Sequence, residues 1–279
     1  MTNLPVPTLD HVVINARDQL DDVAALYRRL GFHLTPRGHH TLGSMNNLAI
    51  FGTDYLELIA VPPDSTRRSS ILTYPFGLNA VVFGAEDADR IHASLTEAGA
   101  PVQPPNDFSR PVDYEGGSGD AAFRTLHVSP AAFPAGRLYF CQHRTRNLVW
   151  RDEWRRHPNG VVGVAGITSV SADPAAMGTL LAGMFGREAV QPIEGGVRLV
   201  VGLSSFDIIS ETAARARFGD AMSAPEGRAD YMVALTLRSI SLDDAAKHLA
   251  DNDIAFSHNQ DRLLVPASET MGATLEFVA

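Results

Sequence analysis

One order of elements recurs four times along this chain, and this recurrence constrains the fold more than any single motif does. In the first copy a β-branched run, 9–15, leads into a helical pattern that Asp18 would cap and Gly31 would end. Three strand-like segments follow, at 32–35, 47–51 and 55–61. The four copies open with the runs 9–15, 78–83, 164–170 and 231–235. Each copy is therefore predicted to be one supersecondary unit of type βαβββ.

The longest gap between copies falls in the middle of the chain. It holds a connector, 145–161, with both tryptophans, Trp150 and Trp154, which we expect to pack at a junction. We therefore predict a first domain over 1–144 and a second over 162–279, each built from two units. A Pro- and Gly-rich excursion, 101–126, interrupts the second unit, and its length is typical of a functional segment.

Composition limits the class of protein and of partner. A hydrophobic content of 45% with 20% charged residues is typical of a globular protein, and the net charge of -9 argues against nucleic acid or anionic membrane as a partner. Cys141 is the only cysteine, which excludes a disulfide framework. No secretory pattern, membrane-spanning run, phosphate-binding loop or hydrolase elbow occurs. We expect a soluble cytoplasmic protein that binds a small molecule, with a homodimer as an open option.

Two strand residues carry groups that bind divalent cations. His11 lies inside the run 9–15, and Glu57 lies between Leu56 and Leu58. Side chains alternate along a strand, so both can face one cleft, where imidazole and carboxylate would suit a divalent ion with open positions. From the residues alone, His11 could instead be a hydrogen-bonded core histidine, and Glu57 could be an exposed carboxylate on the outer face.

Four βαβββ units in two pairs resemble the vicinal oxygen chelate superfamily, which includes glyoxalases, extradiol dioxygenases, and fosfomycin and bleomycin resistance proteins. The first half is most similar to the glyoxalase-like group, through Leu9-Asp10-His11-Val12-Val13, Gly38-His39-His40 and Tyr55-Leu56-Glu57-Leu58. The resemblance covers most of the chain in layout, while its motifs lie in the first unit. It implies an α+β protein of two glyoxalase-like domains with half-barrel sheets and metal ligands on the first and last strands of each unit.

The resemblance implies a metal centre in the first half, holding Zn, Mn, Fe or Ni. His11 and Glu57 stand at two ligand places. At the other two, Asn79 replaces a frequent His or Gln and Tyr139 replaces a frequent carboxylate. His143 lies four residues beyond Tyr139 in the same strand phase, so it could reach the mouth of the cleft as a further ligand.

The second half departs further from the family pattern. Asp207 and Glu276 keep its acidic places, but Ile167 stands at the histidine place of the third unit, and the fourth unit offers only Met232 or Val233. An extradiol dioxygenase of this fold would need two histidines and a glutamate there. The sequence therefore argues against ring cleavage, and we predict that the second half is a structural partner without a metal.

Further polar residues are candidates for contact with a substrate. His40 lies in a polar turn before a strand, and we predict that it acts as a general acid or base beside Glu57. Arg110 and Arg124 could hold an anionic group, with surface ion pairs as the alternative. The predicted substrate contacts are His39, His40, Asn47, Asn79, Arg110, Arg124 and Tyr139.

Together these residues favour a glyoxalase-like enzyme that acts on a small oxygenated metabolite with lyase or isomerase chemistry. A divalent metal on His11, Glu57 and His143 would bind vicinal oxygens and stabilise an enediolate or similar anion. One alternative is a metal-free binding protein of the resistance or sequestration type, which would grip its ligand through His40, Arg124 and aromatic walls. Another is a metal-free hydrolase or isomerase with His11 as the base.

Overall fold

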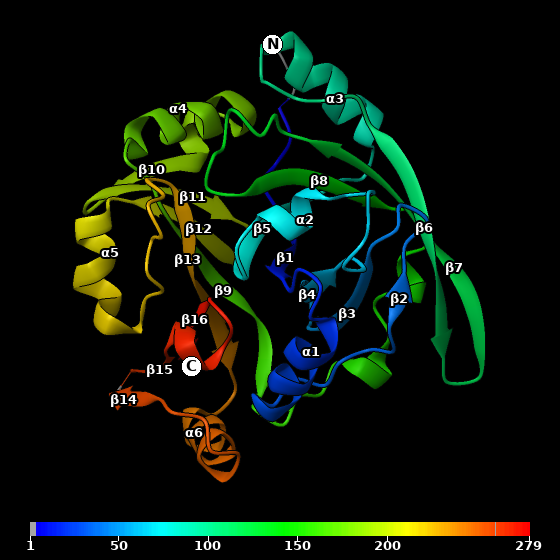
Figure 1. Ribbon diagram of the computed structural model, residues 1–279. Helices are drawn as coiled ribbons and strands as arrows, with labels where there is room; N and C mark the ends of the chain where they lie inside the picture. Colours follow the sequence, from blue (N-terminus) through cyan, green and yellow to red (C-terminus); the bar gives the residue numbers. More distant parts are fainter. Residues whose placement is uncertain (1–3, 260) are drawn as a thin grey trace.

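The computed structural model describes residues 4–259 and 261–279, which form two eight-stranded mixed sheets (Figure 1). The first sheet contains β1 (Leu9–Asn15), β2 (Gly38–His39), β3 (Met45–Ile50), β4 (Tyr55–Ala60), β5 (Gly77–Gly84), β6 (Asn106–Tyr114), β7 (Gly117–His127) and β8 (Arg137–His143). The second contains β9 (Val161–Val170), β10 (Val190–Ile193), β11 (Gly196–Val201), β12 (Ser204–Ile209), β13 (Tyr231–Ser239), β14 (Ser257–Asn259), β15 (Arg262–Val265) and β16 (Thr274–Val278). Their spatial orders are β2-β3-β4-β1-β5-β8-β7-β6 and β10-β11-β12-β9-β13-β16-β15-β14.

Each sheet repeats one plan twice. At the centre of the first sheet β1 pairs antiparallel with β5, while β4 runs parallel to β1 and β8 runs parallel to β5. The strands β9, β12, β13 and β16 have the same arrangement in the second sheet. The predicted α+β fold of four βαβββ units is therefore confirmed.

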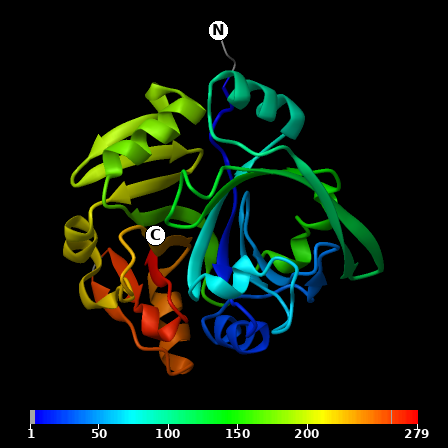
Figure 2. The same cartoon turned by 45° about the horizontal axis from the view of Figure 1, so that its top comes forward.

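The excursion expected at 101–126 is a long β-hairpin instead. β6 and β7 pair from Asn106 and Thr125 to the turn, and their buried residues alternate, with Val112, Ala121 and Phe123 on the inner side. Pro and Gly residues hide this period of two in the sequence. The hairpin reaches across to the other edge of the sheet, where the Thr41 amide donates to the Ser109 carbonyl over 2.9 Å. The first sheet therefore curls until its edges meet, and its strands form a ring in Figure 2.

Two local predictions in the first unit were wrong. The segment 32–35 forms no strand, because Phe32 and Leu34 are buried in the apolar cluster without pairing to a neighbour. The edge strand is β2, which lies in the expected turn and pairs Gly38 with Asn46. Asp18 does not cap the first helix. The helix begins at Leu20, and Gln19 is its N-cap residue.

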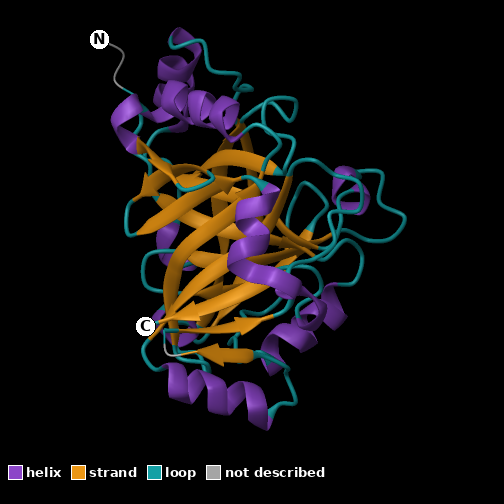
Figure 3. Ribbon diagram, turned by 90° about the vertical axis from the view of Figure 1, so that its left-hand side faces the viewer, coloured by secondary structure: helices purple, strands orange, loops and turns teal. Residues whose placement is uncertain are grey.

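Six α-helices are described: α1 (Leu20–Arg29), α2 (Ser70–Thr73), α3 (Ala88–Glu97), α4 (Pro174–Phe185), α5 (Glu211–Phe218) and α6 (Leu242–Asp251). The N-cap side chains of α3, α4, α5 and α6 accept a backbone amide of the first turn, as Asp and Ser do in this place. Helices lie at both ends of the stacked strands and across one side (Figure 3). None of the helices in the described part of the chain is long and apolar enough to cross a membrane.

Aromatic side chains join the two halves. Phe185 of α4 packs against Phe83 and Phe140 of the first sheet, with ring centroids 4.8 and 5.7 Å apart, and Phe133 meets Phe206 across the same boundary. These residues belong to one apolar cluster that includes both sheets. The halves are therefore packed on a shared core.

The connector packs against the first half. His157 donates from Nε2 to the Ile50 carbonyl and accepts the His33 amide at Nδ1, which ties the connector to the first sheet. Both tryptophans were expected at the junction between the halves, but they lie in the first half. Trp154 is buried in the inner apolar cluster of the first half, and Trp150 packs on Tyr55 at its end, because that open end of the ring needs an apolar cover.

The inner faces of the two sheets have different surroundings. In the second half α5 lies on the inner face, where Ala214 and Phe218 pack with Ile209, Tyr231 and Val233. In the first half the corresponding face borders a cavity of about 380 Å³. The candidate site is therefore in the first half.

Candidate functional site

His11 and Asp10 share one side of β1 because the strand bulges there. Leu9 pairs with Phe83 and His11 with Val82, so Asp10 is an extra residue opposite the same stretch of β5. The bulge brings Oδ1 of Asp10 within 2.6 Å of Nδ1 of His11. Since a carboxylate only accepts, His11 donates from Nδ1, and its Nε2 atom keeps the lone pair. Tyr55 stacks on the imidazole at 4.3 Å between ring centroids and fixes its orientation.

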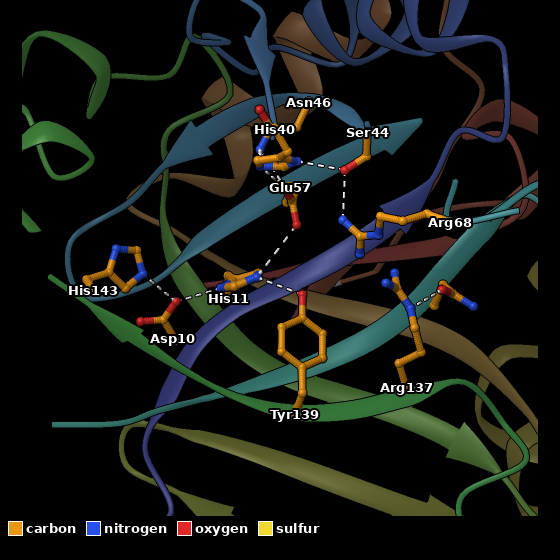
Figure 4. Close-up of polar contacts among 11 residues, drawn as sticks. Asp10, His11, His40, Ser44, Asn46, Glu57, Arg68, Arg137, Tyr139 and His143 are labelled. Carbon is orange, nitrogen blue, oxygen red and sulfur yellow. Dashed lines mark hydrogen bonds and ion pairs between the residues drawn. The ribbon is translucent and has the colours of Figure 1, made fainter. Parts of the chain in front are cut away.

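The Nε2 atom of His11 faces two oxygens on the cavity wall (Figure 4). The Tyr139 hydroxyl lies 3.2 Å from it, and Oε2 of Glu57 lies 3.6 Å from it. Burial raises the pKa of Tyr139, so its hydroxyl stays protonated and donates to His11. Burial also opposes ionisation of Glu57, but His11 and a hydrogen bond from Asn46 outweigh it and lower the Glu57 pKa. Glu57 is therefore a carboxylate beside a neutral phenol.

A chain of hydrogen bonds behind Glu57 sets the state of His40. The Asn46 amide donates to Oε1 of Glu57 over 2.6 Å and to Nε2 of His40 over 3.2 Å. His40 must then donate from Nδ1 to the Ser44 hydroxyl, 2.8 Å away. Burial lowers the pKa of His40 to about 3, an effect that Glu57 opposes and that Arg110 reinforces. His40 is thus a neutral residue that lines the cavity and contacts Asn46, and its role as a general acid or base stays a prediction.

Three arginines line the cavity away from His11. Arg110 comes from β6, Arg137 from the start of β8, and Arg68 from the segment before α2. Arg110 was expected at the site, whereas Arg68 and Arg137 were not. Arg137 could have been found from its phase, because it precedes Tyr139 by two residues on one strand face. Arg68 gives no signal in the sequence, since it lies in a loop.

Five predicted site residues do not line the cavity: Asn79, described below, and the four that follow. His39 is exposed on β2, and Asn47 donates from its amide to the Thr35 carbonyl over 2.9 Å. Arg124 points to the opposite side of β7, where it pairs with Asp89 and Asp107, because neighbouring residues of a strand face opposite ways. His143 donates to Asp10 over 3.1 Å on the side of Asp10 away from Glu57, so it cannot complete a ligand set with Glu57.

Strand register corrects the expected counterparts of His11. His11 pairs with Tyr55, two places before Glu57, and the equivalent residues are Ala80, Gly166 and Ala234. Asn79 and Ile167 are each one place off, because counting back from the helices does not give the register of these strands against their parallel neighbours. Asn79 instead accepts from Nε of Arg137 over 2.8 Å and positions that arginine. Tyr139 does occupy the counterpart place of Glu57.

The acidic residues at the corresponding places of the second half are paired with arginines. Asp207 pairs with Arg198 at 2.6 Å and Arg217 at 3.4 Å, and Glu276 pairs with Arg217 at 2.7 Å and Arg262 at 2.6 Å. Arg217 projects from α5, which covers this face. Each carboxylate thus has its counter-charge from the protein itself, and the pair resembles a structural ion-pair network.

The donor atoms near His11 fit a divalent cation. Their separations of 3.2 and 3.6 Å from Nε2 suit neighbouring ligands of one ion at metal–ligand distances of about 2.0–2.2 Å. The hydrogen bond from Nδ1 to Asp10 is the outer contact that ligating histidines usually make. His11 and Glu57 would therefore supply imidazole and carboxylate ligands facing the cavity, with the protonated Tyr139 hydroxyl beside them.

A second group of donors lies on the other side of Asp10. The ligand atoms of Asp10, Cys141 and His143 are all within 4.8 Å of one another, so this triad could also hold a metal ion. Nδ1 of His143 is buried without a hydrogen-bond partner in the described structure. Burial raises the pKa of the Cys141 thiol, and Asp10 raises it further, so this thiol is a poor ligand until a cation displaces its proton. No pattern in the sequence groups these residues, because Asp10 joins them only through the bulge.

Comparison with known proteins agrees with this architecture. Over 98% of this chain and 99% of the other, the structure is similar to a hypothetical protein from Staphylococcus aureus, with 13% identity and a TM-score of 0.68. It is also similar to a mutant of 4-hydroxymandelate synthase from Streptomyces coelicolor, with 13% identity, coverage of 99% and 93%, and a TM-score of 0.58. A third similar structure is a fusion of a xylose isomerase-like TIM barrel with 4-hydroxyphenylpyruvate dioxygenase, with 11% identity, coverage of 99% and 50%, and a TM-score of 0.56.

At such identities these likenesses show the fold, which is that of the vicinal oxygen chelate proteins. No curated protein matches the sequence. Residues 9–185, more than half of the chain, match the model of the family described as glyoxalase-like domain. The chain therefore belongs to the glyoxalase-like domain family.

Proposed function

We propose that the first half is a glyoxalase-like enzyme of the lyase or isomerase type, acting on a small oxygenated metabolite in the cavity beside His11. The observation that carries the proposal is the convergence of His11, Glu57 and Tyr139 on one point of the cavity wall. A divalent cation bound there would supply Lewis acidity to two neighbouring oxygens of the substrate.

The residues of the chain divide the remaining work. Asp10 keeps the lone pair of His11 at Nε2, and Asn46 holds Oε1 of Glu57, so Oε2 faces the cavity and can accept a proton from a substrate carbon. The Tyr139 hydroxyl can donate a hydrogen bond to a developing oxygen anion, since burial keeps it protonated. The enclosing wall of strands limits access of water to this point.

A metal-free binding protein is the second candidate, and the arginines of the cavity favour it. They can hold a ligand without a metal, as a resistance or sequestration protein would. Metal content separates the two candidates. Under the enzyme proposal the protein takes up one equivalent of Mn²⁺, Fe²⁺, Zn²⁺ or Ni²⁺ on dialysis, measured by mass spectrometry of the metal.

Four variants locate that ion. His11→Ala and Glu57→Gln should lose it, while His39→Ala, which removes an exposed histidine, should keep it. Cys141→Ser tests the Asp10, Cys141 and His143 group: loss there with retention in Glu57→Gln would move the metal to that group and overturn the assignment to the cavity. A wild-type protein that takes up none of the four ions would overturn the metalloenzyme proposal.

Proton transfer can be followed directly. Small 2-oxo and 2-hydroxy carbonyl compounds incubated with the metal-loaded protein in D₂O should exchange a proton at the carbon adjacent to a carbonyl group, seen by NMR. Exchange should fall in Glu57→Gln and persist in His39→Ala. Equal exchange in the two variants would exclude Glu57 as the proton acceptor.

A further inference from the structure

We propose that the cavity binds a substrate with an anionic group, a carboxylate or a phosphate, held by Arg68, Arg110 and Arg137. The inference rests on the proposed function only in placing the reacting end of that substrate at Glu57. Anion binding itself follows from the arginines and can be tested without metal or turnover.

The three guanidinium groups have no carboxylate partner among the described residues. Arg68 donates from Nη1 to the Ser44 hydroxyl over 2.7 Å, and Arg137 donates from Nε to the Asn79 side chain over 2.8 Å. Both acceptors are neutral. Nη2 of Arg137 and Nε of Arg110 are buried without any hydrogen-bond partner in the described structure. These atoms are donors that a ligand could satisfy.

Other arginines of this protein show what the usual solution is. Arg198, Arg217 and Arg262 reach the inner face of the second sheet, and each pairs with Asp207 or Glu276. On the outer face of the first sheet, Arg124 pairs with two aspartates. Only in the first cavity do several inward-facing arginines lack such a partner in the described part of the chain. An anion from outside is the missing counter-charge, because unpaired buried charges are costly.

The surroundings confirm an excess of positive charge. Burial lowers the pKa of Arg68, and Arg137 lowers it further by repulsion. Burial lowers the pKa of His127 to about 3, with Arg137 and Arg68 adding to the effect. The carboxylate of Glu57 attracts Arg68 and Arg110 and partly opposes the lowering of their pKa, but it lies next to His11 and forms no ion pair with these arginines. Arg68 and Arg137 point toward the same space in Figure 4.

The absence of a side chain at Gly38 leaves space for Arg110. A Cβ atom on Gly38 of β2 would clash with Oδ1 of Asn46 and would lie 2.7 Å from Cδ and 2.8 Å from Nη1 of Arg110, closer than atoms can approach. Glycine therefore lets the β6 arginine, only 3% exposed, lie across the neighbouring edge strand. A guanidinium presents paired N–H donors that match carboxylate or phosphate oxygens, and a cavity of about 380 Å³ admits a small metabolite.

The test is binding of inorganic phosphate and of malonate to EDTA-treated protein, measured by calorimetry at constant ionic strength, with chloride as the background ion and glycerol as an uncharged control. The wild type should bind at least one of the two anions. Arg110→Gln and Arg137→Lys should bind about tenfold more weakly or worse, as expected for loss of a charge-assisted or bidentate hydrogen bond. Arg124→Gln removes a positive charge from the outer face and should bind like the wild type.

The outcomes decide the inference. Binding of phosphate alone or malonate alone supports it and identifies the anionic group. Binding of neither, or equal weakening by Arg124→Gln, overturns it. If Arg110→Gln fails to fold, the anion affinity of Arg137→Lys decides the inference. Arg137 is half-buried and lysine keeps the positive charge, so this variant should fold. Glu57→Gln separates this inference from the proposed function: it should retain anion binding even where it abolishes proton exchange.

Discussion

His11 and Asp10 are consecutive residues whose side chains meet on one side of β1, with Nδ1 and Oδ1 2.6 Å apart. In a regular strand consecutive side chains point to opposite faces. The bulge at Asp10 removes that alternation. The Asp10 carboxylate therefore accepts the Nδ1 proton of His11 in a hydrogen bond, and Nε2 presents its lone pair to the cavity. Since the equivalent places hold Ala80, Gly166 and Ala234, this arrangement occurs in only one of the four units described.

Replacing Asp10 tests the value of that contact. Asp10→Asn keeps the size of the side chain but removes the negative charge that holds the Nδ1 proton of His11. We expect metal affinity to fall about 10- to 100-fold, as is usual for outer contacts of ligating histidines. A competition titration with a chelating dye would measure it. Asp243→Asn, on the exposed face of α6, is the control, and equal affinities in the two variants would contradict the prediction.

The Tyr139 hydroxyl can be removed with little change in packing. Tyr139→Phe keeps the ring stacked on His127, where the centroids are 4.5 Å apart, and takes away the donor to His11. We expect proton exchange to fall about 10- to 100-fold, while the free energy of unfolding changes by less than about 1 kcal/mol. NMR exchange rates and urea unfolding would report the two quantities. An unchanged exchange rate would limit Tyr139 to a packing role.

Gly38→Ala tests whether the space beside Gly38 sets the position of Arg110. The added methyl must displace both Arg110 and the side-chain oxygen of Asn46, so affinity for phosphate or malonate should fall about tenfold, and stability should fall by about 1 kcal/mol from overpacking. The matched control is Gly183→Ala on α4, where nothing lies within 4 Å of the new atom. That variant should keep its affinity and gain about 0.5–1 kcal/mol of helix stability. Similar affinities in the two variants would show that Gly38 does not set the position of Arg110.

The fold could be predicted from the sequence because the order of elements repeats, and each copy supports the assignment of the others. The proximity of His11 and Glu57 also followed from strand alternation. The contact with Asp10 could not, because a bulge is a property of pairing with β5 and leaves no period in the chain. Asn79, and not Ala80, was taken as the counterpart of His11 because counting back from the helix does not give the register of a strand against its parallel neighbour.

The arginines show a second limit of the sequence. Arg110 and Arg124 looked equivalent, but the inner or outer side of each depends on the hairpin register of β6 and β7. Arg68 enters the cavity from a loop, whose path no local pattern predicts. Residues on regular strands could thus be assigned in part, whereas those placed by bulges, hairpins and loops required the structure.

Glu276 of the second half provides a test of stability and its pH dependence. Burial opposes its ionisation, but Arg217, Thr236 and Arg262 together lower its pKa below the ordinary value of 4.5. A carboxyl group with a lowered folded pKa stabilises the protein above its unfolded pKa, and this stabilisation is lost as pH falls through the folded value. Glu276→Gln should therefore cost about 2–3 kcal/mol at pH 7, less than a fully buried pair because both arginines reach solvent.

The difference between wild type and Glu276→Gln should shrink once pH falls below 4.5 and become smallest below the folded pKa, where the wild-type carboxyl is also protonated. Urea unfolding at pH 7, 5 and 3.5 would measure it. Glu97→Gln, on the exposed side of α3, should change stability by less than about 0.5 kcal/mol throughout. A Glu276→Gln difference that stays constant from pH 7 to pH 3.5 would mean that shape, and not charge, makes this residue stabilising. Metal uptake by the first half should remain equal to wild type in Glu276→Gln, since the arginine-paired carboxylate lies outside the cavity that His11 borders.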